Sequence, residues 1–173
     1  VLDVKAKNGI HYLVMEFVQG ETARERCKRK GPLKEQEALA IVLGAALGLR
    51  DAHAQGIVHR DIKPDNVLVS TQGAIKLADL GLAKQKQTAG DQNLTVLSSG
   101  VMGTPQFMPP EQWRTPDVTP AADVWALGAT LWYLLAGKSA IPAGEMLTIA
   151  EHIRDHDFPS ILDVRKDVRP EVA

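Results

Sequence analysis

The segment from Thr119 to Gly137 places the strongest constraint on how this 173-residue chain can fold. Thr119 followed by Pro120 is a helix start signal, since threonine is a favoured N-cap and proline is tolerated at the first helical position. Apolar side chains then lie on both sides of the predicted helix: Val124, Leu127, Leu131, Leu134 and Leu135 on one side, Trp125, Ala129 and Trp132 on the other. A helix that is apolar all round belongs in the middle of a domain. The sequence therefore predicts a domain built around this helix.

The composition fits one globular domain. Hydrophobic residues make up 45% of the chain and charged residues 24%, so disorder and collagen-like repeats are excluded. With 20 Lys and Arg against 21 Asp and Glu, the net charge of -1 gives no overall field for nucleic acid or an anionic membrane. Local charged patches stay open, so the net charge alone does not choose the partner, and no nucleic-acid partner is expected.

Two observations bear on the compartment. The longest apolar stretches, residues 40–49 and 124–137, are shorter than the ~18 residues that a membrane-spanning helix needs. A single cysteine, Cys27, cannot form an internal disulfide, which fits a reducing compartment. The expectation is a cytoplasmic domain with no membrane span in this segment, and a membrane anchor elsewhere in the parent protein stays open.

Hydrophobic periodicity predicts a second helix and several short strands. Apolar residues recur at helical spacing from Lys34 to Ala52, and Gly56 ends that helix. The predicted strands are rich in β-branched residues and lie at residues 10–18, 57–58, 67–69 and 74–78. An Asn-Gly pair before the first of them predicts a strand pair, and Thr71-Gln72-Gly73 predicts a hairpin turn. Residues 84–104 have no period and are expected to form a long loop.

Four motifs in a fixed order carry the chemistry. Residues 59–66 read HRDIKPDN, and thirteen residues after Asn66 comes the DLG of residues 79–81. Residues 103–111 read GTPQFMPPE, and the predicted central helix contains the DVWALG of residues 123–128. In this order the motifs resemble those of the eukaryotic-type protein kinases, whose catalytic loop H-R-D-x-x-x-x-N precedes D-F-G. The overall likeness is to the eukaryote-like serine/threonine kinases of bacteria.

The resemblance implies a role for each polar residue. Asp61 would act as the catalytic base for the acceptor hydroxyl, and Lys63 would neutralise charge on the γ-phosphate of ATP. Asn66 and Asp79 would hold Mg²⁺, a hard ion that takes oxygen ligands. Thr104 would support Asp61 and Lys63 through its hydroxyl. The lysine at position 63 resembles the residue found there in the serine/threonine branch of the kinases. The implied partner is therefore a protein with a serine or threonine acceptor.

The same resemblance implies a nucleotide site. Residues 15–18 resemble the hinge between the two kinase lobes, where the backbone of Glu16 and Val18 would bind adenine. Met15 would guard the pocket behind the base, and Leu68 would pack beneath it. Taken alone, such an apolar run is only a strand, and its distance before the catalytic loop is what favours the hinge. The implied cofactors are ATP and Mg²⁺.

Two further residues of the catalytic loop have implied roles outside the chemistry. Arg60 would bind a phosphate added to the long loop, with Thr95 and residues 98–99 as candidate acceptors. His59 would be a packed structural side chain stacked against Leu80, which stands where the family has phenylalanine.

Some family motifs are missing from these 173 residues. Neither a G-x-G-x-x-G loop nor a lysine of the V-A-I-K type precedes the hinge; the lysine of residues 74–76 falls after the catalytic loop, where order excludes it. We expect an α+β fold: a mainly helical large lobe with a short hinge strand pair and a small β-hairpin, the small N-terminal lobe being largely absent. Residues 1–20 would end the small lobe and form the hinge, and residues 21–173 would form a C-terminally truncated large lobe.

Three functions follow. The first is an active serine/threonine protein kinase, of which this chain alone would be inactive. The second is a non-catalytic interaction module derived from a kinase. The third is a small-molecule phosphotransferase, against which residues 103–111 count because their counterpart in the family positions a protein substrate. A kinase dimer is also possible.

Overall fold

A computed structural model of the chain describes residues 3–7, 10–80, 105–115 and 117–173. The fold is of the α+β class. Its helices are α1 (Ala23–Lys30), α2 (Glu35–His53), α3 (Pro120–Ala136) and α4 (Met146–Asp155). Its strands are β1 (Asp3–Lys7), β2 (Ile10–Val14), β3 (Gly20–Thr22), β4 (Val67–Ser70) and β5 (Ile75–Leu77). Short 3₁₀ turns include η2 (Pro105–Phe107), η3 (Pro110–Trp113) and η4 (Ile161–Asp163).

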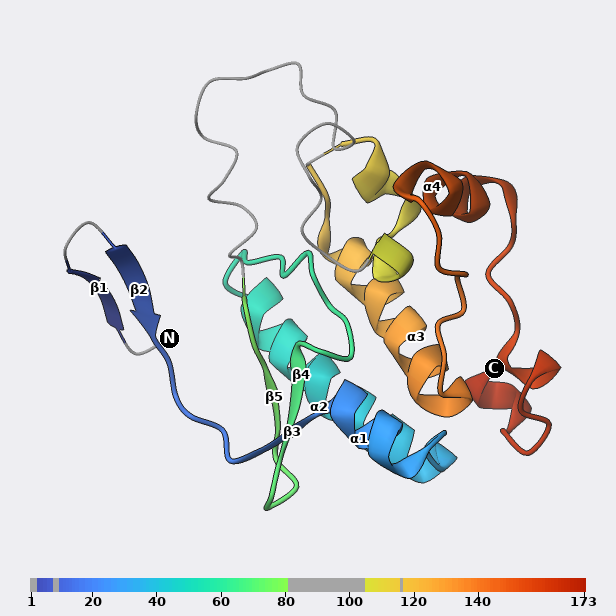
Figure 1. Cartoon of the computed structure of the whole chain (residues 1–173), viewed down its shortest axis with the longest axis horizontal. Coiled ribbons are helices and arrows are strands. Elements are labelled where there is room, and N and C mark those ends of the chain that lie inside the picture. The colour runs from blue at the N-terminus through green and yellow to red at the C-terminus, as the bar shows by residue number, and fades with distance from the viewer. Residues whose placement is uncertain (1–2, 8–9, 81–104, 116) are drawn as a thin grey trace.

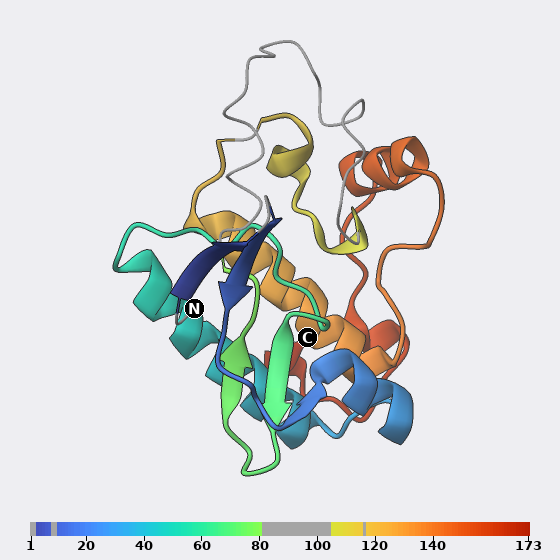
Figure 2. The same ribbon diagram turned by 60° about the vertical axis from the view of Figure 1, so that its left-hand side comes forward.

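The central position of α3 confirms the first prediction. Leu134 and Leu135 are almost completely buried, and α2 runs alongside α3 in both views (Figures 1 and 2). The helix begins at Pro120 as predicted, although the Thr119 side chain makes no capping hydrogen bond among the described residues. Gly137 ends the helix in the left-handed conformation, at φ 74°, with its N–H donating to the Tyr133 carbonyl. Only glycine adopts that conformation without steric cost.

The second predicted helix, α2, packs against the sheet through two glycines. β3, β4 and β5 form an antiparallel sheet in which β4 is central. Gly44 and Gly48, one turn apart on α2, face Ile75 and Leu77 of β5. A β-carbon built at Gly44 would lie 2.6 Å from the Ile75 β-carbon, so the missing side chain lets helix and strand approach. This contact holds the predicted hairpin of β4 and β5 on the helical core.

Helix α1 was not predicted, although its start signal is present in the sequence. Thr22 and Glu25 form a reciprocal capping box: the Thr22 Oγ1 accepts from the Glu25 N–H, and the Glu25 carboxylate accepts from the Thr22 N–H. The T-x-x-E spacing is the signature of such a box. The last turn of α1 carries three basic residues, which interact favourably with the negative end of the helix dipole.

The predicted strand pair at the N-terminus is confirmed as β1 and β2, which pair from Asp3 with Val14 to Lys7 with Ile10. The hairpin stands apart from the helical body, to the left in Figure 1. Residues 57–58, in contrast, form no strand, because the Ile57 N–H donates instead to the Ala52 carbonyl and extends the turn that follows α2. The predicted loop at residues 84–104 lies outside the described residues.

Candidate active site

A buried carboxylate anchors the first residues of the predicted catalytic loop, residues 59–66. Asp123, in the first turn of α3, is completely buried, and its two oxygens accept hydrogen bonds from the backbone N–H groups of His59 and Arg60, each at 2.8 Å. The Nε2 of His53, at the end of α2, lies 2.8 Å from the same carboxylate. Arg60 has a positive φ of 69°, which costs energy in a non-glycine residue. Asp123 supplies the bonds that hold this conformation.

His59 links the catalytic loop to the strand that leads to Asp79. Its ring is fully buried, with Nε2 2.9 Å from the Ala78 carbonyl and Nδ1 3.3 Å from the Asp61 N–H. A carbonyl can only accept, so the ring proton lies on Nε2 and Nδ1 accepts. His59 is thus a packed side chain with two hydrogen bonds, while its stacking against Leu80, which is 42% exposed, stays a prediction.

Three of the predicted catalytic residues meet at the Asp61 carboxylate. The Lys63 Nζ lies 2.7 Å from Oδ2 and 3.0 Å from Oδ1 of Asp61. The Asn66 Nδ2 donates to the Asp61 carbonyl at 2.8 Å and to Oδ2 at 3.0 Å. About a third of the Asp61 side chain is exposed, whereas Asn66 is buried. The buried amide thus fixes an acidic group that still reaches the surface.

Asp79 follows Ala78, which two backbone contacts hold against the loop that carries Asp61 and Asn66. The Ala78 N–H donates to the Asn66 carbonyl at 2.9 Å, and the Ala78 carbonyl receives the His59 bond. Asp79 itself is exposed and has a φ of 61°, in the left-handed region. The structure brings the predicted metal ligands to one end of the β4 and β5 hairpin.

The donor set at this end fits magnesium. Because the Nδ2 of Asn66 is engaged with Asp61, the atom that its amide can offer a metal is Oδ1, and Asp79 offers an exposed carboxylate. The described residues contain no cluster of three or more His, Cys, Asp or Glu suited to a metal. Mg²⁺ does not need such a cluster, since it commonly takes one or two protein ligands together with substrate phosphates and water.

Two of the predicted nucleotide residues, Leu68 and Glu16, are tied to the sheet face that is turned away from α2. Val67 and Val69 point to the core, so Leu68 between them points to the opposite face. Leu68 is directly opposite Lys76 on β5, and the Lys76 Nζ lies 2.6 Å from the Glu16 Oε2. This ion pair brings the predicted hinge to the face that carries Leu68.

The remaining hinge residues lie between β2 and β3. The Met15 side chain is 49% exposed, and Val18 is half-buried. Thr104 and the candidate phosphate acceptors at residues 95 and 98–99 lie outside the described residues.

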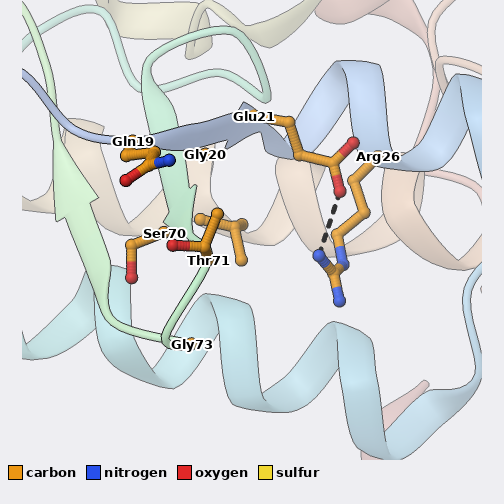
Figure 3. A pocket seen from close by; sticks show the side chains of 8 residues that line it. Gln19, Gly20, Glu21, Arg26, Ser70, Thr71 and Gly73 are labelled. Carbon is orange, nitrogen blue, oxygen red and sulfur yellow. Dashed lines mark hydrogen bonds and ion pairs between the residues drawn. The ribbon is translucent and has the colours of Figure 1, made fainter.

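A separate hollow of about 540 Å³ opens at the other end of β4 (Figure 3). Its walls come from β3 and from the turn between β4 and β5, and they include the ion pair of Glu21 with Arg26 at 3.0 Å. Asn66 precedes the opposite end of β4, so this hollow is distinct from the candidate active site.

Sequence reasoning missed the residues that position the site. Asp123 belongs to the DVWALG motif of residues 123–128, but no role was predicted for it, although a lone acid in the first turn of an otherwise apolar helix was a usable signal. Gln112 on η3 donates to the Arg60 carbonyl at 3.0 Å, and no local pattern marked that contact. Arg24 on α1 pairs with Asp65 at 2.7 Å across a separation that sequence spacing does not reveal.

The α+β fold and the placing of Asp61, Lys63, Asn66 and Asp79 around one hairpin agree with the order of the kinase-like motifs in the sequence. The family described as protein kinase domain matches residues 1–172. The chain therefore belongs to the protein kinase domain family, as its motifs predicted.

Three bacterial proteins are similar to this chain. The chain is 36% identical over 169 residues to the serine/threonine-protein kinase PknL of Mycobacterium tuberculosis (strain CDC 1551 / Oshkosh), a match that covers 96% of this chain and 41% of that protein. It is 35% identical over 149 residues to PknB of Mycobacterium leprae (strain TN), covering 86% of this chain and 24% of that protein. It is 34% identical over 175 residues to the probable serine/threonine-protein kinase pknA2 of Bifidobacterium longum (strain NCC 2705), covering 100% of this chain and 22% of that protein. The chain thus spans less than half the length of each.

No helix among the described residues is long and apolar enough to cross a membrane.

Proposed function

We propose that this chain carries the catalytic loop and metal ligands of an ATP-dependent serine/threonine protein kinase. In this proposal the γ-phosphoryl group of ATP passes to a serine or threonine hydroxyl of a protein, and Asp61 takes the hydroxyl proton. The observation that carries the proposal is the Asp61 carboxylate, held by the Asn66 amide at 3.0 Å and still a third exposed. A general base must be both oriented and reachable.

Each polar side chain then has one task. Asp61 orients the acceptor hydroxyl, and the buried Asn66 keeps the Asp61 carboxylate in place while its Oδ1 serves as a metal ligand. Asp79 is the second ligand. Magnesium, when bound, supplies charge neutralisation for the nucleotide phosphates. Lys63, which pairs with Asp61 in this structure, carries the positive charge that is closest to the base and would neutralise the γ-phosphate.

The nucleotide face is part of the same proposal. Leu68 offers an apolar surface beneath the adenine, and the backbone at Glu16 and Val18 would bind its edge. Met15 would close the space behind the base. Residues 1–20 are then the end of a small lobe and the hinge, and residues 21–173 belong to the large lobe. Thr104 would complete the group around Asp61 and Lys63.

Replacing Asp61 by asparagine in the product of the complete open reading frame tests the base. The amide keeps the shape of the side chain but cannot take the proton, so phosphoryl transfer from labelled ATP to serine and threonine peptides should fall by about 10²–10⁴-fold. Asp51→Asn is the matched control, since Asp51 is exposed and pairs only with its neighbour Arg50 in the described structure. Unchanged transfer by Asp61→Asn would contradict the assignment.

Nucleotide binding separates the metal ligand from the base. Asp79→Ala should weaken magnesium-dependent ATP binding, measured by calorimetry, whereas Asp61→Asn should leave it nearly unchanged. A complete protein that binds ATP without turnover would favour the non-catalytic interaction module. The 173 residues contain no Gly-rich loop before the hinge, so this chain alone is expected to bind ATP very weakly and to be inactive.

A further inference from the structure

Arg24, the second residue of α1, contacts three other segments of the chain. Its Nε donates to the Asp65 carboxylate of the catalytic loop at 2.7 Å. Its guanidinium carbon lies 4.8 Å from the centre of the Tyr133 ring on α3 and 5.8 Å from that of Phe107 on η2. Its backbone N–H donates to the Pro64 carbonyl at 3.1 Å. One residue of α1 therefore meets the catalytic loop, the segment after residue 104 and the central helix.

The surroundings make this contact more than a surface ion pair. Phe107 and Tyr133 are 3% and 6% exposed and meet edge to face with ring centres 6.0 Å apart. The Arg24 side chain is 21% exposed, so aromatic groups cover much of it. A guanidinium over aromatic rings is fixed in its plane, and its hydrogen bonds are directed.

Asp65 lies beside the residue that orients the base. Asn66 donates to Asp61 through its side chain, and its backbone N–H donates to the Lys63 carbonyl. Asp123 holds only the other end of the loop, at His59 and Arg60. Next to Asn66, the ion pair of Asp65 with Arg24 joins the loop to a side chain from outside it.

We propose that Arg24 is a positioning residue that fixes the Pro64–Asn66 part of the catalytic loop against η2, so that the Asn66 amide stays on the Asp61 carboxylate. The catalytic consequence rests on the proposed kinase function. The positioning itself does not, because it concerns contacts that exist in the protein without substrate.

Arg26 provides a matched control on the same helix. Its side chain is 24% exposed and forms ion pairs with Glu21 at 3.0 Å and Glu37 at 2.6 Å. Arg24 and Arg26 thus have similar exposure and each form ion pairs, but the partners of Arg26, Glu21 and Glu37, lie on β3 and α2 and not on the predicted catalytic loop. Arg24→Gln and Arg26→Gln remove the same charge and differ in the segment that loses a partner.

Amide hydrogen exchange in the complete protein gives the first test. Arg24→Gln should raise exchange by about tenfold in peptides that cover residues 63–67 and 105–108, with less change in α2 and α3. Arg26→Gln should raise exchange only near residues 21–37. Asp65→Asn should reproduce the loop effect, and the double variant should be no worse than Arg24→Gln, because both substitutions remove one pair.

Kinetics give the second test, with a readout that loss of stability alone does not produce. Arg24→Gln should lower kcat by about tenfold and leave the KM for ATP within twofold, and Arg24→Lys should recover part of kcat because it keeps the charge. If Arg24→Gln does not fold, Arg24→Lys carries both tests, with a smaller change confined to the same peptides. Exchange that rises equally throughout the protein, or equally in both glutamine variants, would overturn the proposal. An inactive wild type with the expected exchange pattern would instead count against the kinase function and leave the positioning role standing.

Discussion

The two ends of the catalytic loop are held in different ways. At the His59 end, the completely buried Asp123 accepts two backbone hydrogen bonds at 2.8 Å. At the Asn66 end, the Asn66 amide reaches back to the Asp61 carboxylate, which stays about a third exposed. The same chemical group serves as a scaffold where all its bonds point inward, and as a candidate base where one side remains open. Burial, and not residue type, separates the two roles.

This difference predicts that substitutions at Asp123 mainly lower the stability of the protein, whereas substitutions at Asp61 mainly lower its activity. Changes beneath the His59 end should cost stability, because they leave buried donors without partners. Changes at Asp61 should cost activity and less stability, because water reaches the open side of its carboxylate and can replace part of the lost contacts.

The largest effect is expected for Asp123→Ala. The substitution leaves the N–H groups of His59 and Arg60, together with the ring of His53, without an acceptor in a buried site. We expect a loss of about 3–5 kcal/mol in the free energy of unfolding, measured with urea. Asp51→Ala, at an exposed aspartate, should change it by less than about 0.5 kcal/mol. If Asp61→Asn proves as destabilising as Asp123→Ala, the distinction between the two ends fails.

A smaller effect is expected where α2 meets β5, which carries the chain to Asp79. A methyl group at Gly44 would lie 2.6 Å from both Cβ and Cγ1 of Ile75, so Gly44→Ala should destabilise by about 1–3 kcal/mol. At Gly48 the nearest atom is the flexible Leu77 Cδ1 at 3.3 Å. Gly48→Ala should therefore be neutral or stabilise by up to about 1 kcal/mol, because alanine favours the helix.

Thermal or urea unfolding of these two variants extends the comparison from the catalytic loop to the contact between α2 and β5. Equal stabilities for Gly44→Ala and Gly48→Ala would show that the approach of α2 to β5 is not fixed by the missing side chain. The contact between α2 and β5 would then tolerate an added methyl group, and only Asp123 would differ from Asp61 in its effect on stability.

The sequence predicted the elements better than the contacts between them. Regular apolar spacing identified α2 and α3, and the turn at Thr71-Gln72-Gly73 identified the hairpin of β4 and β5. Helix α1 was missed because it is short and strongly polar, so only its capping box marked it. The strand predicted at residues 57–58 was wrong, because a backbone bond to Ala52 outweighed the β propensity of Ile57.

The candidate site shows the same limit. The motif HRDIKPDN placed Asp61, Lys63 and Asn66 in one loop, and the structure brings their side chains together. The anchors come from distant segments: Asp123 is 64 positions from His59, and Arg24 is 41 positions from Asp65. Local patterns carry no information on such pairs, which the tertiary packing alone decides.

The smallest effect concerns Asp167, a carboxylate with a shifted pKa that is more exposed than either Asp123 or Asp61. Hydrogen bonds from Arg165 lower the pKa of Asp167 from 3.8 to about 2. Arg165 is itself fixed, since its Nη1 donates to the Leu135 carbonyl at 2.7 Å. Because the pKa is lower in the folded state, the pair stabilises the protein above about pH 4, and this contribution is lost as the pH falls through about 2.

Asp167→Asn should therefore lower the midpoint of thermal unfolding slightly at pH 5, and the difference from the wild type should shrink as the pH approaches 2. Asp163→Asn, at an exposed aspartate of η4, serves as the control. A difference that stays constant over this range would mean that the Arg165 pair contributes nothing through the charge of Asp167. In that case only burial, as at Asp123, would make an aspartate of this protein important for its stability.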